Sequence, residues 1–174
     1  MGHPRRIRKK FFTPVHPWQK ENIEVERALS TEYALVNKHE LWKMKSLLKN
    51  FKDQAKKLIA ARGKQAEREK SQLMQRLQRY GLIKSSSKLD DILGLTIKDI
   101  LERRLQSMVY RKGFARSMKQ ARQFITHRHV KVGERKISSP SHFTTVSEES
   151  LISFSPGSSL TNPETESVIK GLSD

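Results

Sequence analysis

A large excess of positive charge is the feature that most limits how this chain can fold. The 174 residues include 35 Lys and Arg against 18 Asp and Glu, a formal charge of +17. Such a chain repels itself unless an anion neutralises it, and the usual anion is nucleic acid or an anionic membrane. Because only 35% of the residues are hydrophobic, the core can only be modest. We infer that contacts with a partner supply part of the order of this fold.

The positive charge lies in the larger, N-terminal part of the chain. Residues 1–136 hold 34 basic and 13 acidic residues, a net of +21, whereas residues 137–174 hold one basic and five acidic residues, a net of −4. A polyanion-binding body therefore ends in a mildly acidic segment. The Ser, Thr and Pro content from Ser155 onward predicts a flexible tail over residues 155–174.

Several classes of protein and site are not indicated. No run of about 18 apolar residues is present to span a bilayer, and the basic start is not followed by the apolar stretch of a secretory signal. There is no Cys, which removes disulfides, thiolate zinc sites and cysteine nucleophiles together. We therefore expect a cytoplasmic protein with no metal and no other cofactor.

Residues 1–20 are predicted to form an extended basic arm. Prolines at positions 4, 14 and 17 prevent a continuous helix there. Phe11, Phe12 and Trp18 are expected to anchor the arm by packing, although Trp18 can also stack on a base. The residues of this segment that we predict to contact RNA are Arg5, Arg6, Arg8, Lys9, Lys10, Trp18 and Lys20.

Residues 21–100 are predicted to form a helical domain. A short helix is expected over residues 21–35, with Val25, Ala28 and Leu29 on one side. A longer amphipathic helix follows, because apolar residues recur at steps of three and four. These residues are Leu41, Met44, Leu48, Phe51, Ala55 and Leu58. The many lysines between them either form a solvated face or contact phosphates.

Glycines and caps mark where the next helices begin and end. Gly63 is expected to interrupt the long helix, and a second helix should end at Gly81. Thr96 with Asp99 forms a capping box, and the helix that it opens is predicted to run on to about Lys112. Gly113 is a natural C-terminal stop for that helix.

Residues 101–154 are predicted to form a small module after the helical domain. Ser117 and Gln120 form a second capping box, which opens a helix expected to bury Ala121, Phe124 and Ile125. Further on, the apolar period changes from that of a helix to that of a strand.

The strands of this module should form a hairpin. Gly133 and Glu134 separate the first two apolar runs, and Gly in the first central position suits a type II′ turn. The fold class is therefore α+β: a mainly helical N-terminal domain, followed by two short helices packed on a small antiparallel sheet.

Basic residues gather in this module. Between Arg103 and Lys136 there are eleven basic residues and one acid, Glu134. The helix that begins after Ser117 also presents free backbone N–H groups and the positive end of a dipole, which together favour phosphate. The alternative to phosphate binding is that these basic residues form an ordinary solvent-exposed helix face. The predicted RNA-binding residues are Arg103, Arg104, Arg111, Lys112, Arg116, Ser117, Lys119, Gln120, Arg122, Gln123, His127, Arg128, His129, Lys131, Arg135 and Lys136.

His127 and His129 lack a third metal ligand, so no metal site is predicted.

This stretch resembles the RNA-binding module of the ribosomal protein S4 family. The matching features include Gly113-Phe114-Ala115, Ala121-Arg122-Gln123, His129-Val130 and Pro140-Ser141. Two features depart from the family pattern: Gly133-Glu134 stands where Asn-Gly is common, and Arg128 stands where a small residue is common. The cysteine zinc site of bacterial relatives has no counterpart.

The N-terminal part resembles the archaeal and eukaryotic members of the family, most of all the archaeal ones. The segments that carry this resemblance are residues 14–20, 37–42 and 93–96, the last of them followed by residues 101–106. The resemblance implies a structural constituent of the small ribosomal subunit that binds a multi-helix junction of its RNA early in assembly. It also implies a place near the channel where messenger RNA enters, support for translational accuracy, ribosomal protein S5 as a neighbour and contact with messenger RNA itself.

The sequence leaves three alternative functions to weigh. Pseudouridine synthases and tyrosyl-tRNA synthetases carry the same module, but they need a catalytic domain that this chain has no room for, and no P-loop, GxSxG or HExxH motif is present. A free RNA-binding factor or ribosome-associated chaperone would leave the N-terminal resemblance unexplained. A basic amphipathic membrane binder should expose aromatic residues along its apolar stripe. We therefore expect no enzyme, no membrane partner and no DNA.

Overall fold

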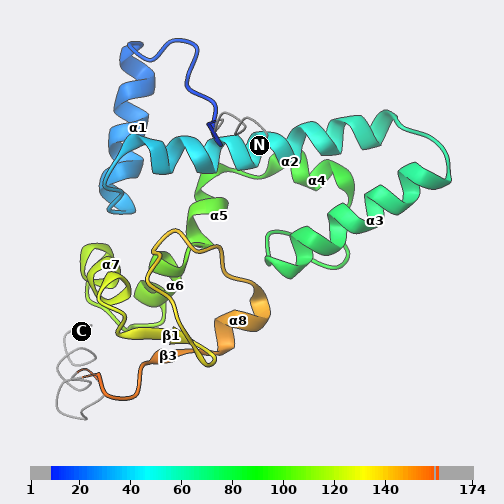
Figure 1. Cartoon of the computed structure of the whole chain (residues 1–174). Helices are drawn as coiled ribbons and strands as arrows, with labels where there is room; N and C mark the ends of the chain where they lie inside the picture. The colour runs from blue at the N-terminus through cyan, green and yellow to red at the C-terminus, as the bar shows by residue number, and fades with distance from the viewer. Residues whose placement is uncertain (1–8, 159, 161–174) are drawn as a thin grey trace, which may run out of the picture.

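The computed structural model describes residues 9–158 and residue 160 as a mainly helical molecule with one small sheet (Figure 1). The elements in chain order are α1 (Lys20–Glu32), α2 (Lys38–Ala60), α3 (Lys64–Arg79), α4 (Leu89–Gly94), α5 (Ile97–Glu102), α6 (Leu105–Arg111), α7 (Met118–Thr126), β1 (Val130–Val132), β2 (Arg135–Lys136), α8 (Val146–Ser150) and β3 (Ile152–Phe154). This architecture confirms the α+β class. Among the described helices, none combines the length and the apolar character needed to cross a membrane.

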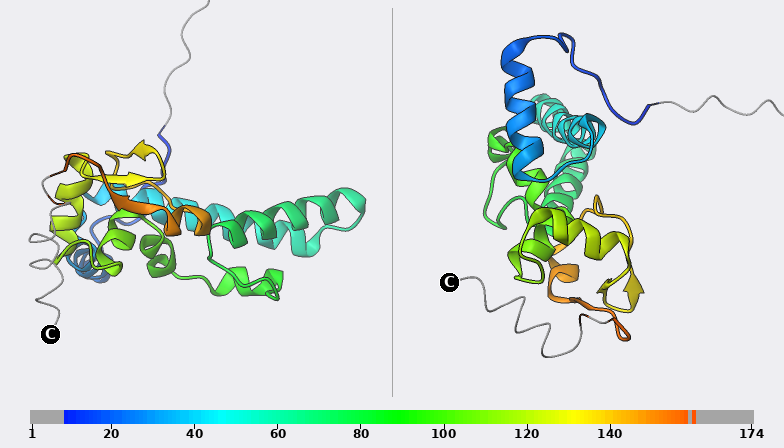
Figure 2. Two further views of the ribbon diagram at one scale, coloured as in Figure 1. Left: turned by 90° about the horizontal axis from the view of Figure 1, so that it is seen from below. Right: turned by 90° about the vertical axis from the view of Figure 1, so that its left-hand side faces the viewer.

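The long helix α2 is the centre of the helical domain. Figure 2 shows α3 folding back along it to give an elongated helical hairpin. Phe51 and Ala55 of α2 pack with Leu77 of α3, Ile92 of α4 and Ile100 of α5, and all five side chains are buried. The predicted apolar stripe of α2 is therefore confirmed as the side that faces the core.

Helix α1 lies at the start of α2, and its buried side differs from the predicted one. Leu29 is buried as expected, but Val25 is 57% exposed and Ala28 is also exposed. Glu26 occupies the interior instead, where it is 3% exposed. It accepts hydrogen bonds from Lys45 Nζ at 2.8 Å and from Trp42 Nε1 at 3.0 Å. These contacts orient the helix, so its apolar residues alone do not indicate which side is buried.

The single helix predicted from residue 97 to about residue 112 is divided in two. Its first part, α5, ends at Glu102, and α6 begins at Leu105. The backbone N–H of Leu105 donates to the carbonyl of His142 at 2.8 Å, so the first turn of α6 is capped by a distant segment. Arg104 also forms an isolated antiparallel bridge with Phe143. Sequence periodicity cannot detect this interruption, because His142 lies 37 residues beyond Leu105 in the chain.

The C-terminal module packs α6 and α7 against a sheet of order β2-β1-β3, in which both pairings are antiparallel. Val132 pairs with Arg135, so Gly133 and Glu134 form a two-residue turn. Gly133 has φ +60° and Glu134 has no positive φ, which confirms the predicted type II′ hairpin. The core joins helices and sheet through buried apolar side chains: Leu105, Val109, Ala121, Ile125, Val130 and Ile152.

The described part of the arm rests on α2. The Phe11 ring lies 5.1 Å from the ring of His39 between centroids, and the Phe12 N–H donates to Ser46 Oγ at 2.8 Å. Phe12 is 62% exposed and Trp18 is 88% exposed, so the prediction that these two side chains anchor the arm by packing is wrong. The predicted RNA contacts Arg5, Arg6 and Arg8 lie outside the described residues, as do residues 159 and 161–174 of the predicted tail.

Phe143 belongs to the module in sequence but packs in the core of the helical domain, where its ring lies 4.6 Å from that of Tyr80. We expect Phe143→Ala to lower the free energy of unfolding by about 2 kcal/mol or more, because it leaves a cavity at this contact. Urea unfolding followed by circular dichroism measures the loss. The control is Leu151→Ala, a residue that is 54% exposed; equal stability of the two variants would contradict this packing.

Candidate nucleic-acid interface

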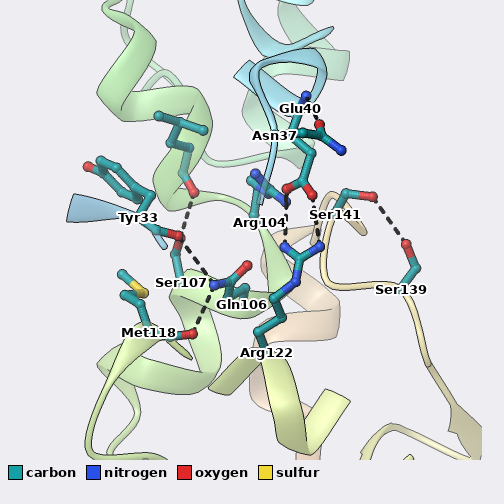
Figure 3. Close-up of polar contacts among 11 residues, drawn as sticks. Tyr33, Asn37, Glu40, Arg104, Gln106, Ser107, Met118, Arg122, Ser139 and Ser141 are labelled. Atoms are coloured by element: carbon teal, nitrogen blue, oxygen red, sulfur yellow. Dashed lines mark hydrogen bonds and ion pairs between the residues drawn. The ribbon is translucent and has the colours of Figure 1, made fainter. Parts of the chain in front are cut away.

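The two parts of the molecule are joined by a carboxylate between two guanidinium groups. Glu40 lies in the first turn of α2, whose N-cap Asn37 accepts a hydrogen bond from the Glu40 N–H at 3.1 Å. Arg104 Nη2 donates to Glu40 Oε2 at 2.6 Å, and Arg122 Nη2 donates to Glu40 Oε1 at 2.8 Å (Figure 3). One side chain of the helical domain thus holds both the α5–α6 junction and the middle of α7.

The charge of Glu40 is retained in this partly buried place. Burial by itself raises the pKa of Glu40, but the hydrogen bonds and positive charges of Arg122 and Arg104 outweigh burial and hold the pKa below its ordinary value of 4.5. The carboxylate is therefore ionised at neutral pH. Its place at the N-terminal end of α2 adds a favourable interaction with the helix dipole.

A second set of hydrogen bonds between the two parts lies beside the Glu40 ion pairs. The Gln106 side-chain amide donates to the carbonyl of Tyr33 at 3.2 Å and to that of Met118 at 2.8 Å, so it bridges the end of α1 to the start of α7 (Figure 3). Burial, with the nearby charge of Glu102, raises the pKa of Tyr33 to about 12. The Tyr33 hydroxyl therefore remains protonated and donates to Glu102 Oε1 at 3.4 Å.

Three arginines predicted to face RNA are turned into the protein. Arg104 is 1% exposed, and Arg122 is committed to Glu40 by two hydrogen bonds. The Arg103 side chain is 14% exposed and pairs with Glu149 at 3.1 Å. Their carboxylate partners lie far away in sequence, so a count of local charge cannot distinguish these arginines from exposed ones. The sequence signal that was missed is Asn37 followed three residues later by Glu40, which marks a capped helix start.

The other predicted residues lie on or near the surface of the module. The exposed ones are Arg111, Lys112, Arg116, Ser117, Lys119, Gln123, His127, Arg128, Arg135 and Lys136, and the half-buried ones are Gln120, His129 and Lys131. Arg111 forms an ion pair with Glu102, and Lys112 donates to the backbone carbonyl of Glu149. Both retain exposed side chains, so an incoming phosphate can compete for them.

The start of α7 is the position at which the sequence predicts phosphate binding. Ser117 Oγ accepts a hydrogen bond from the Gln120 N–H at 3.2 Å, which confirms Ser117 as the N-cap. The Gln120 side chain accepts from the N–H of Arg116 at 2.7 Å, one residue earlier than a capping box requires. A surface hollow next to this helix start is lined by Arg111, Arg116 and Lys119 and also by the carboxylates Glu32 and Glu102, which pair with Lys98 and Arg111. Its cations and helix N-terminus suit an oxyanion.

The far end of α7 adds further cationic surface. Arg128 is exposed and has φ +63°, a left-handed conformation that costs a non-glycine residue about 1–2 kcal/mol. A glycine at this position would avoid that cost. His129 is half-buried, with Nδ1 2.8 Å from Ser158 Oγ. No cluster of three or more side chains suited to a metal occurs among the described residues.

Two family models together cover most of the chain. Residues 2–102 match the ribosomal protein S4/S9 N-terminal domain, and residues 103–149 match the S4 domain. The small ribosomal subunit protein uS4 of Methanococcus aeolicus is 48% identical over 174 residues, which is 98% of each chain. The protein of the same name from Methanococcus vannielii is 50% identical over 159 residues, 91% of this chain and 89% of that protein.

The ion pairs of Glu40 predict a specific response to acid. Because its pKa is lowered in the folded state, the carboxylate stabilises the fold fully above pH 4.5, and this contribution is lost as the pH falls through the lowered pKa. The difference in unfolding free energy between the wild type and Glu40→Gln should therefore shrink as the pH falls below about 4.5. Urea titrations between pH 7 and pH 3 measure it. Glu32→Gln, which removes an exposed pair with Lys98, should show only a small difference throughout; a constant Glu40 effect would contradict this assignment.

Arg122 and Lys119 lie on the same helix but should behave differently when their charge is reversed. Arg122→Glu places a carboxylate against Glu40 and should lower the free energy of unfolding by about 3–5 kcal/mol. Lys119→Glu, on the exposed side, should change it by about 0.5 kcal/mol or less. Thermal or urea unfolding of both variants compares them. Equal stability would show that Arg122 has no structural role.

Proposed function

This chain belongs to the ribosomal protein S4 family, as its sequence resemblance predicted, and we propose that it is a structural constituent of the small ribosomal subunit that binds the subunit's RNA. The function is structural rather than enzymatic. The observation that carries the proposal is the fixed arrangement of two basic surfaces. Exposed cations of the module and exposed lysines of α2 belong to parts that Glu40 holds together.

RNA recognition by this arrangement would depend on shape and phosphate position. Lys and Arg side chains neutralise phosphates, and the start of α7 offers backbone N–H groups to a further phosphate. Double-stranded RNA shows little of its sequence to side chains in its deep major groove. A rigid pair of basic surfaces therefore suits an RNA in which several helices meet, and we propose a multi-helix junction of small-subunit RNA as the target.

The finer features of the proposed function follow the family resemblance. We propose that the chain binds early in assembly and that it lies near the channel where messenger RNA enters, beside ribosomal protein S5. The junction RNA would leave some exposed cations of the module unoccupied, and these cations would be available to messenger RNA. Through these contacts the chain would support translational accuracy, and it would reside in cytoplasmic ribosomes.

Sedimentation of native cell extract in a salt gradient tests the proposal. We expect the chain in the small-subunit peak, in stoichiometric amount and resistant to high-salt washing. Recovery in light fractions, or loss from subunits at moderate salt, would overturn the structural role and favour a free RNA-binding factor or ribosome-associated chaperone.

Reversal of one exposed charge tests the proposed RNA surface. Lys119→Glu should weaken binding to small-subunit RNA and lower the slope of log affinity against log salt concentration by about 1, because one phosphate contact is lost. Lys119→Arg keeps the charge and should bind nearly as the wild type does. Filter binding at several salt concentrations measures both variants. An unchanged slope for Lys119→Glu would show that Lys119 does not contact the RNA.

A further inference from the structure

The exposed side of α1 carries apolar residues that the protein's own core does not cover. The helix buries Glu26 and Leu29, and it leaves Val25 57% exposed and Ala28 exposed on the side next to the buried one. Figure 1 shows α1 at the edge of the molecule, beside the start of α2. Glu21, Val25, Ala28 and Glu32 follow one another at steps of four, three and four, so they form a single line along this helix. We call this line the outer stripe of α1.

The charges around the outer stripe are mainly negative. Helix α1 exposes two cations, Lys20 and Arg27, and three carboxylates, Glu21, Glu24 and Glu32, a net of −1 in a chain of net charge +17. Its fourth carboxylate, Glu26, is buried and paired with Lys38 and Lys45. Glu24 lies 3.9 Å from Lys20, and Glu32 lies 3.1 Å from Lys98. Both pairs are exposed to solvent, so they hold their partners weakly. Within the described residues no ion pair engages Glu21.

Two more apolar side chains precede this helix. Val15 is 87% exposed and Trp18 is 88% exposed. Trp18 lies in the turn that the Gln19 N–H closes by donating to the His16 carbonyl at 3.4 Å, and Val15 directly precedes that turn. Burial of a tryptophan releases a large apolar area, and tryptophan is enriched among the residues that dominate protein–protein binding. Exposed Trp and Val side chains just before a helix that carries a line of exposed Val and Ala are therefore typical of a protein interface.

We infer that the outer stripe of α1, together with Val15 and Trp18, docks a segment of another protein that presents apolar side chains flanked by Lys or Arg. The carboxylates near the outer stripe determine which kind of partner can bind there. RNA phosphates and anionic lipid headgroups would meet Glu21, Glu24 and Glu32 and be repelled, whereas a cationic protein segment would be attracted. The inference rests on the proposed function in one respect, because it locates the partner in the assembled small subunit.

Site-specific cross-linking in the assembled subunit tests the inference. A photoreactive benzoylphenylalanine replaces Val25 in the full chain, and small subunits are purified before irradiation. The control carries the same group in place of Gln65, an exposed residue at the start of α3. We expect the Val25 probe to join one other protein within a segment rich in Lys or Arg, and the Gln65 probe not to join that protein.

Charge reversal adds a second readout. The double variant Glu21→Lys with Glu24→Lys should reduce the yield of the Val25 cross-link at least tenfold, whereas the affinity for isolated small-subunit RNA should not fall. The matched control, Glu67→Lys with Glu69→Lys on α3, makes the same change in net charge and should leave the cross-link unchanged.

The outcomes separate this inference from the proposed function. If the wild-type chain is present in small subunits but the Val25 probe joins only RNA or nothing, the docking surface is overturned. The same holds if both double variants give the same yield. If the wild-type chain is absent from small subunits, the proposed function itself is overturned.

Discussion

One carboxylate shared by two guanidinium groups is the interaction on which the rest of this structure depends. Glu40 approaches Arg104 and Arg122 at 2.6 and 2.8 Å, and Arg104 is 1% exposed. A charge buried to that extent is stable only if it is paired, and loss of its partner costs about 3–5 kcal/mol. Since the three residues come from α2, the α5–α6 junction and α7, the pairing determines how the module sits on the helical domain.

Apolar contacts across the same boundary support this arrangement. Phe143 leaves the module to pack in the helical core beside Tyr80, and Leu101 at the end of α5 is fully buried with Leu29 and Leu41. The two parts are therefore not independent bodies on a linker. The proposed binding function gains from this, because surfaces that are already in place lose little conformational freedom when RNA binds.

The elements that depend on local physics could be predicted from the sequence. The stripe of α2 follows from three- and four-residue spacing, the start of α7 from the Ser117 side chain, and the hairpin from a glycine that accepts φ +60°. The features that were missed all have distant causes. The His142 carbonyl interrupts a helix that is continuous in pattern, and Glu26 turns α1 because lysines of the next helix neutralise it. The sequence alone predicts Arg104 and Arg122 as surface cations, because their partner Glu40 is distant in the chain.

Glu40 fixes the module to the helical domain, and a distance measurement between the two parts tests this role directly. The chain contains no Cys, so Gln65→Cys with Glu134→Cys gives two specific sites for spin labels, one on α3 and one on the β1–β2 turn. Pulsed electron paramagnetic resonance should show one narrow distance distribution in this background and a broadened or shifted one when Glu40→Ala is added. The same narrow distribution with and without Glu40 would contradict the account.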